Sequence, residues 1–418
     1  GTLLATWIGS GSIIGGAGLA FDKGFSALWF DAGVWLAIII LYLVAGRARR
    51  FAQYTVPDIL EARYNHITRL LGTVVTIIAY TAIVSYQFRA GGMVLNLVTG
   101  IPATEGMIIT ALFVIGYTAL SGMFSVAYTD VANGIMMIIG LFIALPFLWS
   151  DAGGWSGMMA RLPAEHFHPL GNMTLLEALG YSLPTMLLLL GESGMYQRFF
   201  SARSETVARK SVIGWIIGTI ILETLIVVLA VVGSALFTDI EGEMVILYSV
   251  RHGIPVAVGC ILLAAIVAVI VSTADSFLLV PATNIMRDIV QRFLQPDISQ
   301  KKMVFYSRIV VVLLGAVAFV QVQFFEKVLK MALYAYTMYG VGITPAVMAA
   351  FFWKRATPAG GAASIAAGMT LTLTWEIGKQ PFGLPTVYPA LAASLLALIV
   401  VSILTKPPAK SRWRPFFD

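Results

Sequence analysis

Residues 8–16 read Ile-Gly-Ser-Gly-Ser-Ile-Ile-Gly-Gly and interrupt an apolar run that is otherwise long enough to cross a membrane. A second apolar run is interrupted in a similar way at residues 191–194, which read Gly-Glu-Ser-Gly, with Pro184 shortly before them. Small and polar residues weaken a helix at such points and free backbone carbonyls that can bind an ion. The glycines of either run are also explained by close helix packing. Their presence at matching positions favours two broken helices.

The composition around these runs is that of a membrane protein. Of the 418 residues, 59% are hydrophobic and only 11% are charged, and the mean hydropathy is +0.87. A water-soluble chain of this length needs a larger charged surface. The single cysteine, Cys260, excludes an intrachain disulfide and a Cys-based metal cluster. The four histidines show no metal-ligand spacing.

The apolar runs between turn residues predict an all-α integral membrane protein with about twelve spans. The predicted spans cover residues 3–21, 26–46, 68–97, 103–121, 124–149, 174–199, 207–238, 254–288, 303–325, 328–352, 359–379 and 385–405. Residues 1–405 thus form one transmembrane domain, and residues 406–418 form a short tail. Because the chain opens on Gly and runs directly into an apolar segment, we expect the native N-terminus to lie further upstream.

The basic residues of the loops gather on one side of these spans. Six fall on the opposite side, namely Lys23, Arg161, Arg251, Lys327, Lys330 and Lys379, and Arg89 lies within a span. The other 20 of the 27 Lys and Arg share one face, which the positive-inside rule predicts to be cytoplasmic together with the C-terminus. The net charge of +6 therefore reflects topology, and we expect no nucleic-acid partner.

This orientation makes spans one and six cross the membrane in opposite directions. Residues 3–149 and 174–352 are then predicted to be inverted five-helix repeats, a common plan of secondary transporters. Residues 359–405 supply two extra helices. In this plan the first helix of each repeat is the one broken at the binding site, which agrees with the two interrupted runs.

Ionisable side chains inside spans are costly and point to function. Those of this chain are Asp31, Arg89, Asp130, Glu192, Glu223 and Asp275. In span eight, Ser272, Asp275 and Ser276 share one helix face and Thr273 is turned slightly away. Hydroxyl and carboxylate oxygens suit a hard cation such as Na⁺. Alternatively, the hydroxyls bond back to carbonyls of their own helix.

Other polar positions leave two interpretations open. Asp130 lies near the cytoplasmic end of its span. It either supplies a second carboxylate to a cation or has a structural role, as a helix cap or an ion-pair partner. Arg89 holds a solute carboxylate or pairs with Asp31 or Glu192, and we favour the pairing. Tyr336, in a stretch rich in tyrosines, lines a cavity or packs against other rings.

Six segments give the chain a close resemblance to the sodium:solute symporter family. They read IIGGAGLAF, VPDILEARYN, SGMFSVAYTDVANG, YQRFFSARS, STADSFLLVPATNIMRDI and FFWKRATPAGG, in chain order, and are spread over nearly the whole chain. Asn133 departs from the glutamine usual in the third segment. The resemblance implies the five-plus-five inverted repeat of the leucine-transporter type. Family members usually carry one more helix before the first core helix.

The resemblance also implies roles for single residues. The main sodium site would use the carbonyls of Ala5, Ile8 and Val269 and the hydroxyls of Ser272 and Thr273. A second site, for Na⁺ or H⁺, would use Asp130, Asp275 and Ser276, although a hydroxyl is common where this chain has Asp275. Sugar-binding members contact their solute at positions matching Ser12, Asp31 and Glu192, and Arg89 and Tyr336 are further candidates for solute binding.

We therefore expect a sodium-driven symporter that imports a small polar organic solute by alternating access. Two acidic groups and one Arg favour an amino acid, a betaine or another zwitterion, while a sugar, a monocarboxylate, a vitamin or a solute sensor on the same fold stay as alternatives. The spans offer no nucleophile–base pair or transition-metal site, so we expect neither an enzyme nor a cofactor besides the coupling ion Na⁺. We expect a monomer in the cell membrane, which is the inner membrane in a Gram-negative bacterium.

Overall fold

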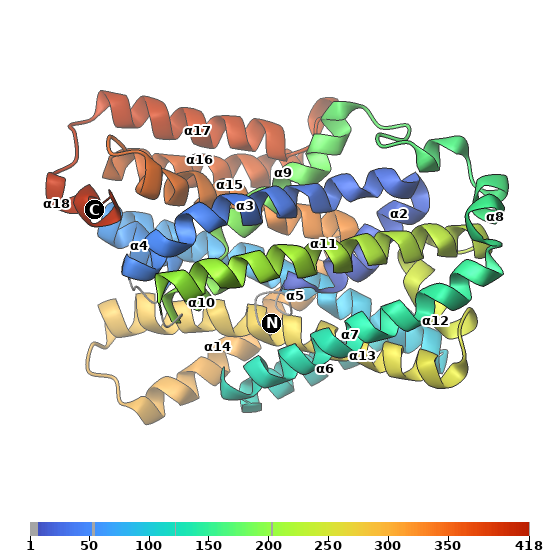
Figure 1. Ribbon diagram of the computed structural model, residues 1–418. Coiled ribbons are helices and arrows are strands. Elements are labelled where there is room, and N and C mark those ends of the chain that lie inside the picture. The colour runs from blue at the N-terminus through green and yellow to red at the C-terminus, as the bar shows by residue number, and fades with distance from the viewer. Residues whose placement is uncertain (1–6, 52–54, 122, 202–203, 418) are drawn as a thin grey trace.

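Helices make up most of the chain in the computed structural model, which describes residues 7–51, 55–121, 123–201 and 204–417 (Figure 1). The first half contains η1 (Gly11–Gly16), α2 (Ala17–Lys23), η2 (Gly24–Ala27), α3 (Leu28–Phe51), α4 (Val56–Arg63), α5 (His66–Thr99), α6 (Ala103–Ser121), α7 (Met123–Asp151), α8 (Gly154–Arg161), η3 (Ala164–Phe167), α9 (Leu175–Gly191) and α10 (Ser193–Ser201). The second half contains α11 (Glu205–Leu236), η4 (Gly242–Met244), α12 (Val245–His252), α13 (Val256–Asn284), η5 (Ile285–Leu294), α14 (Gln300–Gln321), η6 (Val322–Phe324), α15 (Val328–Phe352), α16 (Pro358–Ile377), η7 (Pro381–Gly383), α17 (Val387–Leu404) and α18 (Lys410–Phe417). The all-α architecture predicted from the apolar runs is confirmed.

Ten stretches of the described residues are long and apolar enough to span a membrane. One of them, Gly11–Gly46, holds two helices, because the chain turns at Gly24 between α2 and α3. Gly24 has φ +65°, and a Cβ there would collide with the backbone of His166, so the turn requires glycine. α16 is a further 20-residue helix, packed along α17. Each of the twelve predicted spans therefore falls on helical chain, which is continuous in some spans and divided into consecutive helices in others.

α15 lies at the centre of the helix bundle. In its most apolar window 89% of the residues are buried, against 22% for α14 at the periphery. α15 packs against α5, α9 and α16, and α5 in turn packs against α13. Close approach is possible because Gly340 of α15 faces the backbone of α9 at Leu187 and Leu188. Groups on α15, and on the faces of α5 and α9 that pack against it, are thus shielded from lipid.

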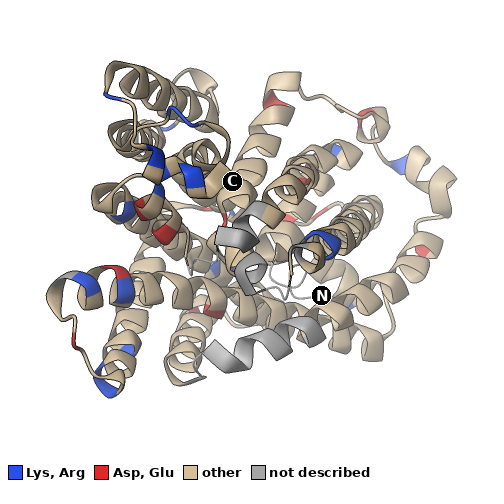
Figure 2. Ribbon diagram, turned by 60° about the vertical axis from the view of Figure 1, so that its left-hand side comes forward, with Lys and Arg blue, Asp and Glu red and all other residues tan. Residues whose placement is uncertain are grey.

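Basic residues from distant loops meet at one end of the bundle, which we call the basic end. It is formed by α4, α18 and the α13–α14 and α15–α16 connections, and Figure 2 brings it forward. Arg63 donates to the carbonyls of Trp353 and Lys354, at 3.0 and 3.2 Å. The Lys354 ammonium lies 4.9 Å from the Trp413 ring of α18. The loops that hold Arg63 and Lys354 and the C-terminal segment, which the charge pattern assigned to one face, therefore lie together.

Both predicted helix breaks are present. Ile8 and Gly9 are not helical, and the chain continues as the π-helical segment η1. Glu192 has an extended backbone, with φ −65° and ψ 121°, and separates α9 from α10. We call these the first break and the second break.

Candidate functional site

The first break and α13 bring together the oxygens expected to bind Na⁺. The Thr273 hydroxyl lies 3.4 Å from the carbonyl oxygen of Ile8, and the Ser272 hydroxyl lies 3.3 Å from that of Val269. Both separations exceed the roughly 2.7–2.8 Å usual for O–H···O hydrogen bonds. Oxygens that share a hard cation at about 2.4 Å each are spaced in this way. Each pair is thus spaced as two ligands of one cation would be, whereas Ala5 lies outside the described residues.

The α13 hydroxyls face different carbonyls. Thr273, which was expected to turn slightly away from Ser272, Asp275 and Ser276, faces the Ile8 carbonyl of the first break. The Ser272 hydroxyl makes its long contact with a carbonyl of its own helix, which is the kind of partner that the alternative interpretation predicted. Asp275 is 1% exposed and Ser276 is half-buried one residue later. The side chain of Asp130 lies outside the described part of the chain.

Gln87 of α5 places an amide beside the sodium candidates. Its Oε1 accepts from the Ser10 hydroxyl at 2.7 Å and from the Ser10 backbone N–H at 3.4 Å. The backbone donor determines the orientation of the amide, since only the oxygen can face it. The Nε2 of Gln87 then points towards Gly9 and Thr273, and in the described part of the chain it has no acceptor. A buried donor without an acceptor is a place for a ligand oxygen.

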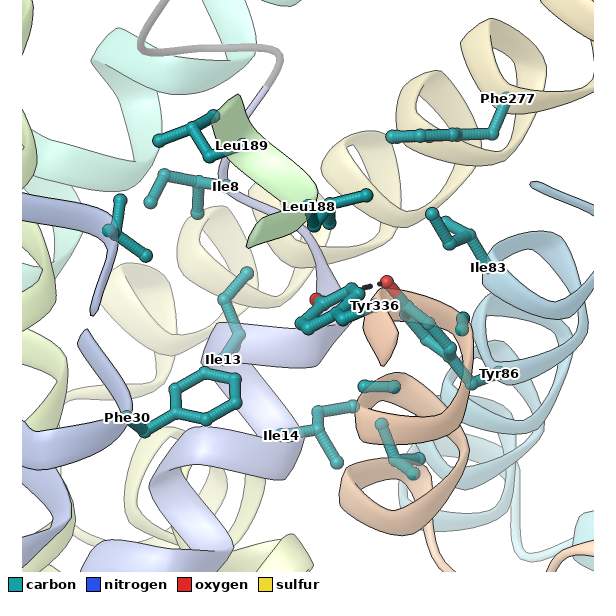
Figure 3. Close-up of a cluster of buried hydrophobic side chains, with 14 of the residues drawn as sticks. Ile8, Ile13, Ile14, Phe30, Ile83, Tyr86, Leu188, Leu189, Phe277 and Tyr336 are labelled. Carbon is teal, nitrogen blue, oxygen red and sulfur yellow. Dashed lines mark hydrogen bonds between the residues drawn. The ribbon is translucent and has the colours of Figure 1, made fainter. Parts of the chain in front are cut away.

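Tyr336 of α15 reaches η1, immediately after the first break. Its hydroxyl lies 3.2 Å from that of Tyr86, and Figure 3 shows the pair between η1 and α5, with Phe30 and Ile13 nearby. A Cβ on Gly11 would collide with the Tyr336 hydroxyl, so glycine permits this approach. Ser12, the next residue, is also buried in η1. Tyr336 thus has a polar neighbour as well as the ring contacts of the packing alternative.

Two acidic side chains, Glu223 and Asp31, lie near these aromatic residues. Glu223 of α11 accepts hydrogen bonds from the indole N–H groups of Trp7 and Trp35, both at 2.8 Å. Asp31, one turn before Trp35 on α3, interacts electrostatically with Glu223 and with Tyr336. Both carboxylates are almost fully buried. Asp31, Glu223 and Tyr336 therefore act on one another electrostatically.

The carboxylate of Glu192, by contrast, binds backbone and side-chain groups of the second break. Its carboxylate accepts from the backbone N–H groups of Gly194 and Met195, at 2.9 and 2.7 Å, and from the Tyr80 hydroxyl at 2.8 Å. The Tyr339 hydroxyl donates to the carbonyl of Gly191 at 2.9 Å. The free ends of α9 and α10 are therefore capped by the protein.

Arg89 is not an ion-pair partner of Asp31 or Glu192 among the described residues, which corrects the pairing that we favoured. Its guanidinium donates to the carbonyls of Val322 and Phe325, at 3.2 and 2.6 Å. Carbonyls at the end of a helix have no partner within that helix, and Val322 and Phe325 lie at the end of α14 and just after η6. A guanidinium has enough N–H donors for several such carbonyls. Arg89 therefore ties α5 to the end of α14.

The basic end holds a charge network around a cavity of about 600 Å³. Arg69 contacts Asp58, Glu61 and Asp288, and Arg292 donates to Glu61 at 2.6 Å. Partial burial acts to raise the pKa of Glu61, but the hydrogen bond and charge of Arg69, helped by Arg292, lower it overall. This network joins α4 and α5 to η5.

Sequence reasoning missed Gln87 and Trp7 as site residues and used Glu223 only as a buried charge. A glutamine in an apolar span is a signal that was available, because its amide needs partners in lipid. Trp7 carried no such signal, since a tryptophan in an apolar span is ordinary packing.

Comparison with known proteins agrees with this geometry. Residues 1–368 match the model of the sodium:solute symporter family. The chain is 28% identical over 439 residues to the high-affinity proline transporter PutP of Bacillus subtilis (strain 168), covering 97% of this chain and 89% of that protein. It is 25% identical over 429 residues to the sodium/proline symporter of Staphylococcus aureus, covering 95% and 83%.

Solved structures give the fold. A Na⁺-coupled sialic acid symporter, in a substrate-bound outward-open state, aligns with a TM-score of 0.79 at 18% identity, over 97% of this chain and 89% of that one. The nucleobase-cation-symport-1 family transporter Mhp1, in a closed conformation, aligns with a TM-score of 0.63 at 12% identity, over 99% and 95%. The expected leucine-transporter-type fold is confirmed.

Proposed function

Because this chain belongs to the sodium:solute symporter family, we propose that it couples Na⁺ entry to the import of a small zwitterionic solute by alternating access. The family is one of transporters, and the chain is a multi-pass membrane protein rather than an enzyme. The observation that carries the proposal is the approach of the Thr273 hydroxyl to the Ile8 carbonyl at 3.4 Å, across 265 positions of sequence.

The proposed sodium ligands are the carbonyls of Ile8 and Val269, the hydroxyls of Ser272 and Thr273, and the carbonyl of Ala5. The first four are supported by the two oxygen separations of 3.3 and 3.4 Å given above. They join η1 and its break to α13, so that Na⁺ binding favours the arrangement in which these elements touch. A second cation site at Asp130, Asp275 and Ser276 is part of the same proposal, supported by the burial of Asp275.

The proposed solute is an amino acid, a betaine or another zwitterion. The unpaired Nε2 of Gln87 offers a donor to a carboxylate next to the sodium ligands. Asp31 offers a polar side chain, and the rings of Tyr336 and Trp7 offer aromatic faces, to a cationic group. Ser12, buried in η1, completes the set. The relatives named for proline support the same class, since proline is a zwitterion.

Glu192 and Arg89 are left out of this proposed solute site. The polar atoms of Glu192 bind the second break, and Arg89 binds the end of α14. Both interactions would have to be given up before either side chain could reach a solute, and a buried charge that loses its partners costs several kcal/mol.

We further propose that the basic end is cytoplasmic, with the C-terminus, in the cell membrane. The membrane potential then drives Na⁺ inwards with about 2.3 kcal/mol per charge per 100 mV. One transmembrane domain, with repeats at residues 3–149 and 174–352 and extra helices at 359–405, carries the function as a monomer.

The sodium site is tested by the double variant Ser272→Ala/Thr273→Ala. We expect the wild-type protein in detergent to unfold at a higher temperature in NaCl than in KCl, because Na⁺ binds only the folded state. The double variant is expected to lose this difference. Thr372→Ala, which removes a hydroxyl bonded to its own helix in α16, is the matched control and should retain it. Equal Na⁺ stabilisation in the double variant would refute the site.

The solute class is tested by thermal unfolding with a panel of proline, glycine betaine, glucose and lactate, each with and without Na⁺. We expect the zwitterions to raise the unfolding temperature, and only when Na⁺ is present. Gln87→Glu retains an acceptor for Ser10 but replaces the free donor with a negative charge, so it should lose the solute effect and retain the Na⁺ effect. Stabilisation by glucose or lactate instead would reject the zwitterion and leave the sodium site standing.

A further inference from the structure

Asp31 of α3 and Glu223 of α11 form a pair of acidic side chains in the membrane interior. α3 and α11 pack along each other, and Glu223 is bonded to Trp35, one turn after Asp31. Asp31 is 4% exposed and Glu223 is 1% exposed. The charge of Asp31 acts on Glu223. Two carboxylates that act on each other's charge, with little water around them, are not stable when both are ionised.

The partners of the two carboxylates differ. Each oxygen of Glu223 accepts an indole N–H, from Trp7 on one side and Trp35 on the other. Among the described residues, no hydrogen bond or ion pair reaches the carboxylate of Asp31. N–H donors stabilise a carboxylate anion more strongly than a carboxylic acid. The negative charge is therefore favoured on Glu223, and Asp31 is the neutral member.

The elements packed around the pair supply no positive charge to it in the part of the chain that the structure describes. Tyr336 of α15 is the titratable side chain that interacts with both carboxylates, and its hydroxyl is bonded to Tyr86 of α5. Charged groups of the neighbouring elements have partners elsewhere: Lys23 contacts Asn172, Glu177 caps Thr174, Glu243 caps the start of α15, and Arg89 binds the end of α14.

We propose that Asp31 and Glu223 form a proton-binding site, in which Asp31 holds one proton and Glu223 is the anion. None of the proposed sodium ligands belongs to this pair, so the site is separate from the sodium site. The two are nevertheless joined, because Glu223 holds the indole of Trp7, and the next residue, Ile8, offers its carbonyl to Na⁺. Release of the proton adds a negative charge behind Trp7, and Na⁺ is expected to bind more tightly there.

The proton is tested directly by infrared difference spectroscopy of the purified protein in lipid at neutral pH. We expect wild type to show the carbonyl stretching band of a protonated carboxyl group that Asp31→Asn lacks. Glu223→Gln retains the band, because Asp31 is still buried without a donor. The proposal is overturned if the spectrum of Asp31→Asn has the same carboxyl band as that of the wild type. It is also overturned if the band is absent from Glu223→Gln and present in Asp31→Asn.

The link to sodium is tested by Na⁺ titration of the tryptophan emission at mildly acidic and mildly alkaline pH. Wild type is expected to bind Na⁺ severalfold more weakly at the acidic pH, and Asp31→Asn to bind with an affinity that does not change with pH. Asp22→Asn, at an exposed position on α2, is the matched control and should behave as wild type. A pH dependence that persists in Asp31→Asn contradicts the link. Absence of Na⁺ binding in every protein would contradict the sodium proposal instead and would leave the infrared result unaffected.

Discussion

The two helix breaks occupy matching positions in the two halves of the chain but are completed in different ways. At the second break, Glu192 and Tyr80 satisfy the free backbone groups from within the protein. At the first break, the Ile8 carbonyl has only a long contact to Thr273, and the Gln87 amide has a donor without an acceptor in the described part. The free backbone groups of the second break are thus bound by side chains of the protein, whereas the first break has polar groups that a ligand can bind.

This difference shows that a broken helix is not by itself a binding site. A break frees backbone groups that must find partners. Where a side chain such as Glu192 supplies them, the break is stable alone, and where none does, an ion or solute has to complete it. The comparison can be challenged by variants at each break.

The largest effect is expected for Glu192→Ala. The substitution leaves the N–H groups of Gly194 and Met195 and the hydroxyl of Tyr80 without their acceptor, and orphaned buried donors cost about 1–3 kcal/mol each. We expect a loss of about 3–5 kcal/mol of unfolding free energy. Thermal unfolding without Na⁺ measures it. Thr273→Ala should cost much less under the same conditions, and a larger loss there would reverse the comparison.

A smaller effect, at the first break, is expected for Gly11→Ala. The added Cβ collides with the Tyr336 hydroxyl, and overpacking of this kind costs about 1–3 kcal/mol. The double variant Gly11→Ala/Tyr336→Phe removes the colliding hydroxyl and leaves the nearest atoms at 3.5 and 3.6 Å, which is ordinary contact. We therefore expect it to recover the unfolding temperature. If Phe gives no recovery, the close approach of Tyr336 to η1 is wrong.

The smallest effect is expected at the basic end, away from both breaks, for Glu61→Gln. Arg69 and Arg292 lower the pKa of Glu61 against its partial burial, so its ion pairs stabilise the protein above the usual carboxyl range. That stabilisation is lost as the pH falls through the lowered pKa. Solvent screening limits it to about 0.5–1 kcal/mol. Stability curves against pH should converge at acidic pH, and curves that stay parallel would show that Glu61 is not involved.

Much of the site could be predicted from residue types and family pattern. Of the oxygens expected to share a sodium ion, those of Thr273 and Ile8 come from different elements and lie 3.4 Å apart, while the site as a whole stays a prediction. The pairing of Arg89 with Asp31 or Glu192 failed because helical spacing places a residue on a face and does not say which neighbour that face meets. The assignment of Glu192 to a solute stays a prediction, although its oxygens already have backbone partners.

The sequence by itself determined that the chain crosses the membrane many times, and its glycine and polar runs determined where two helices break. These features depend on composition and on spacing along one helix, which a linear pattern records. Only the tertiary structure decided which break the protein closes with its own side chains and which it leaves open. A hydrogen bond needs a particular distance and direction between atoms on different helices, and that arrangement exists only once α5, α13 and α15 pack around the breaks.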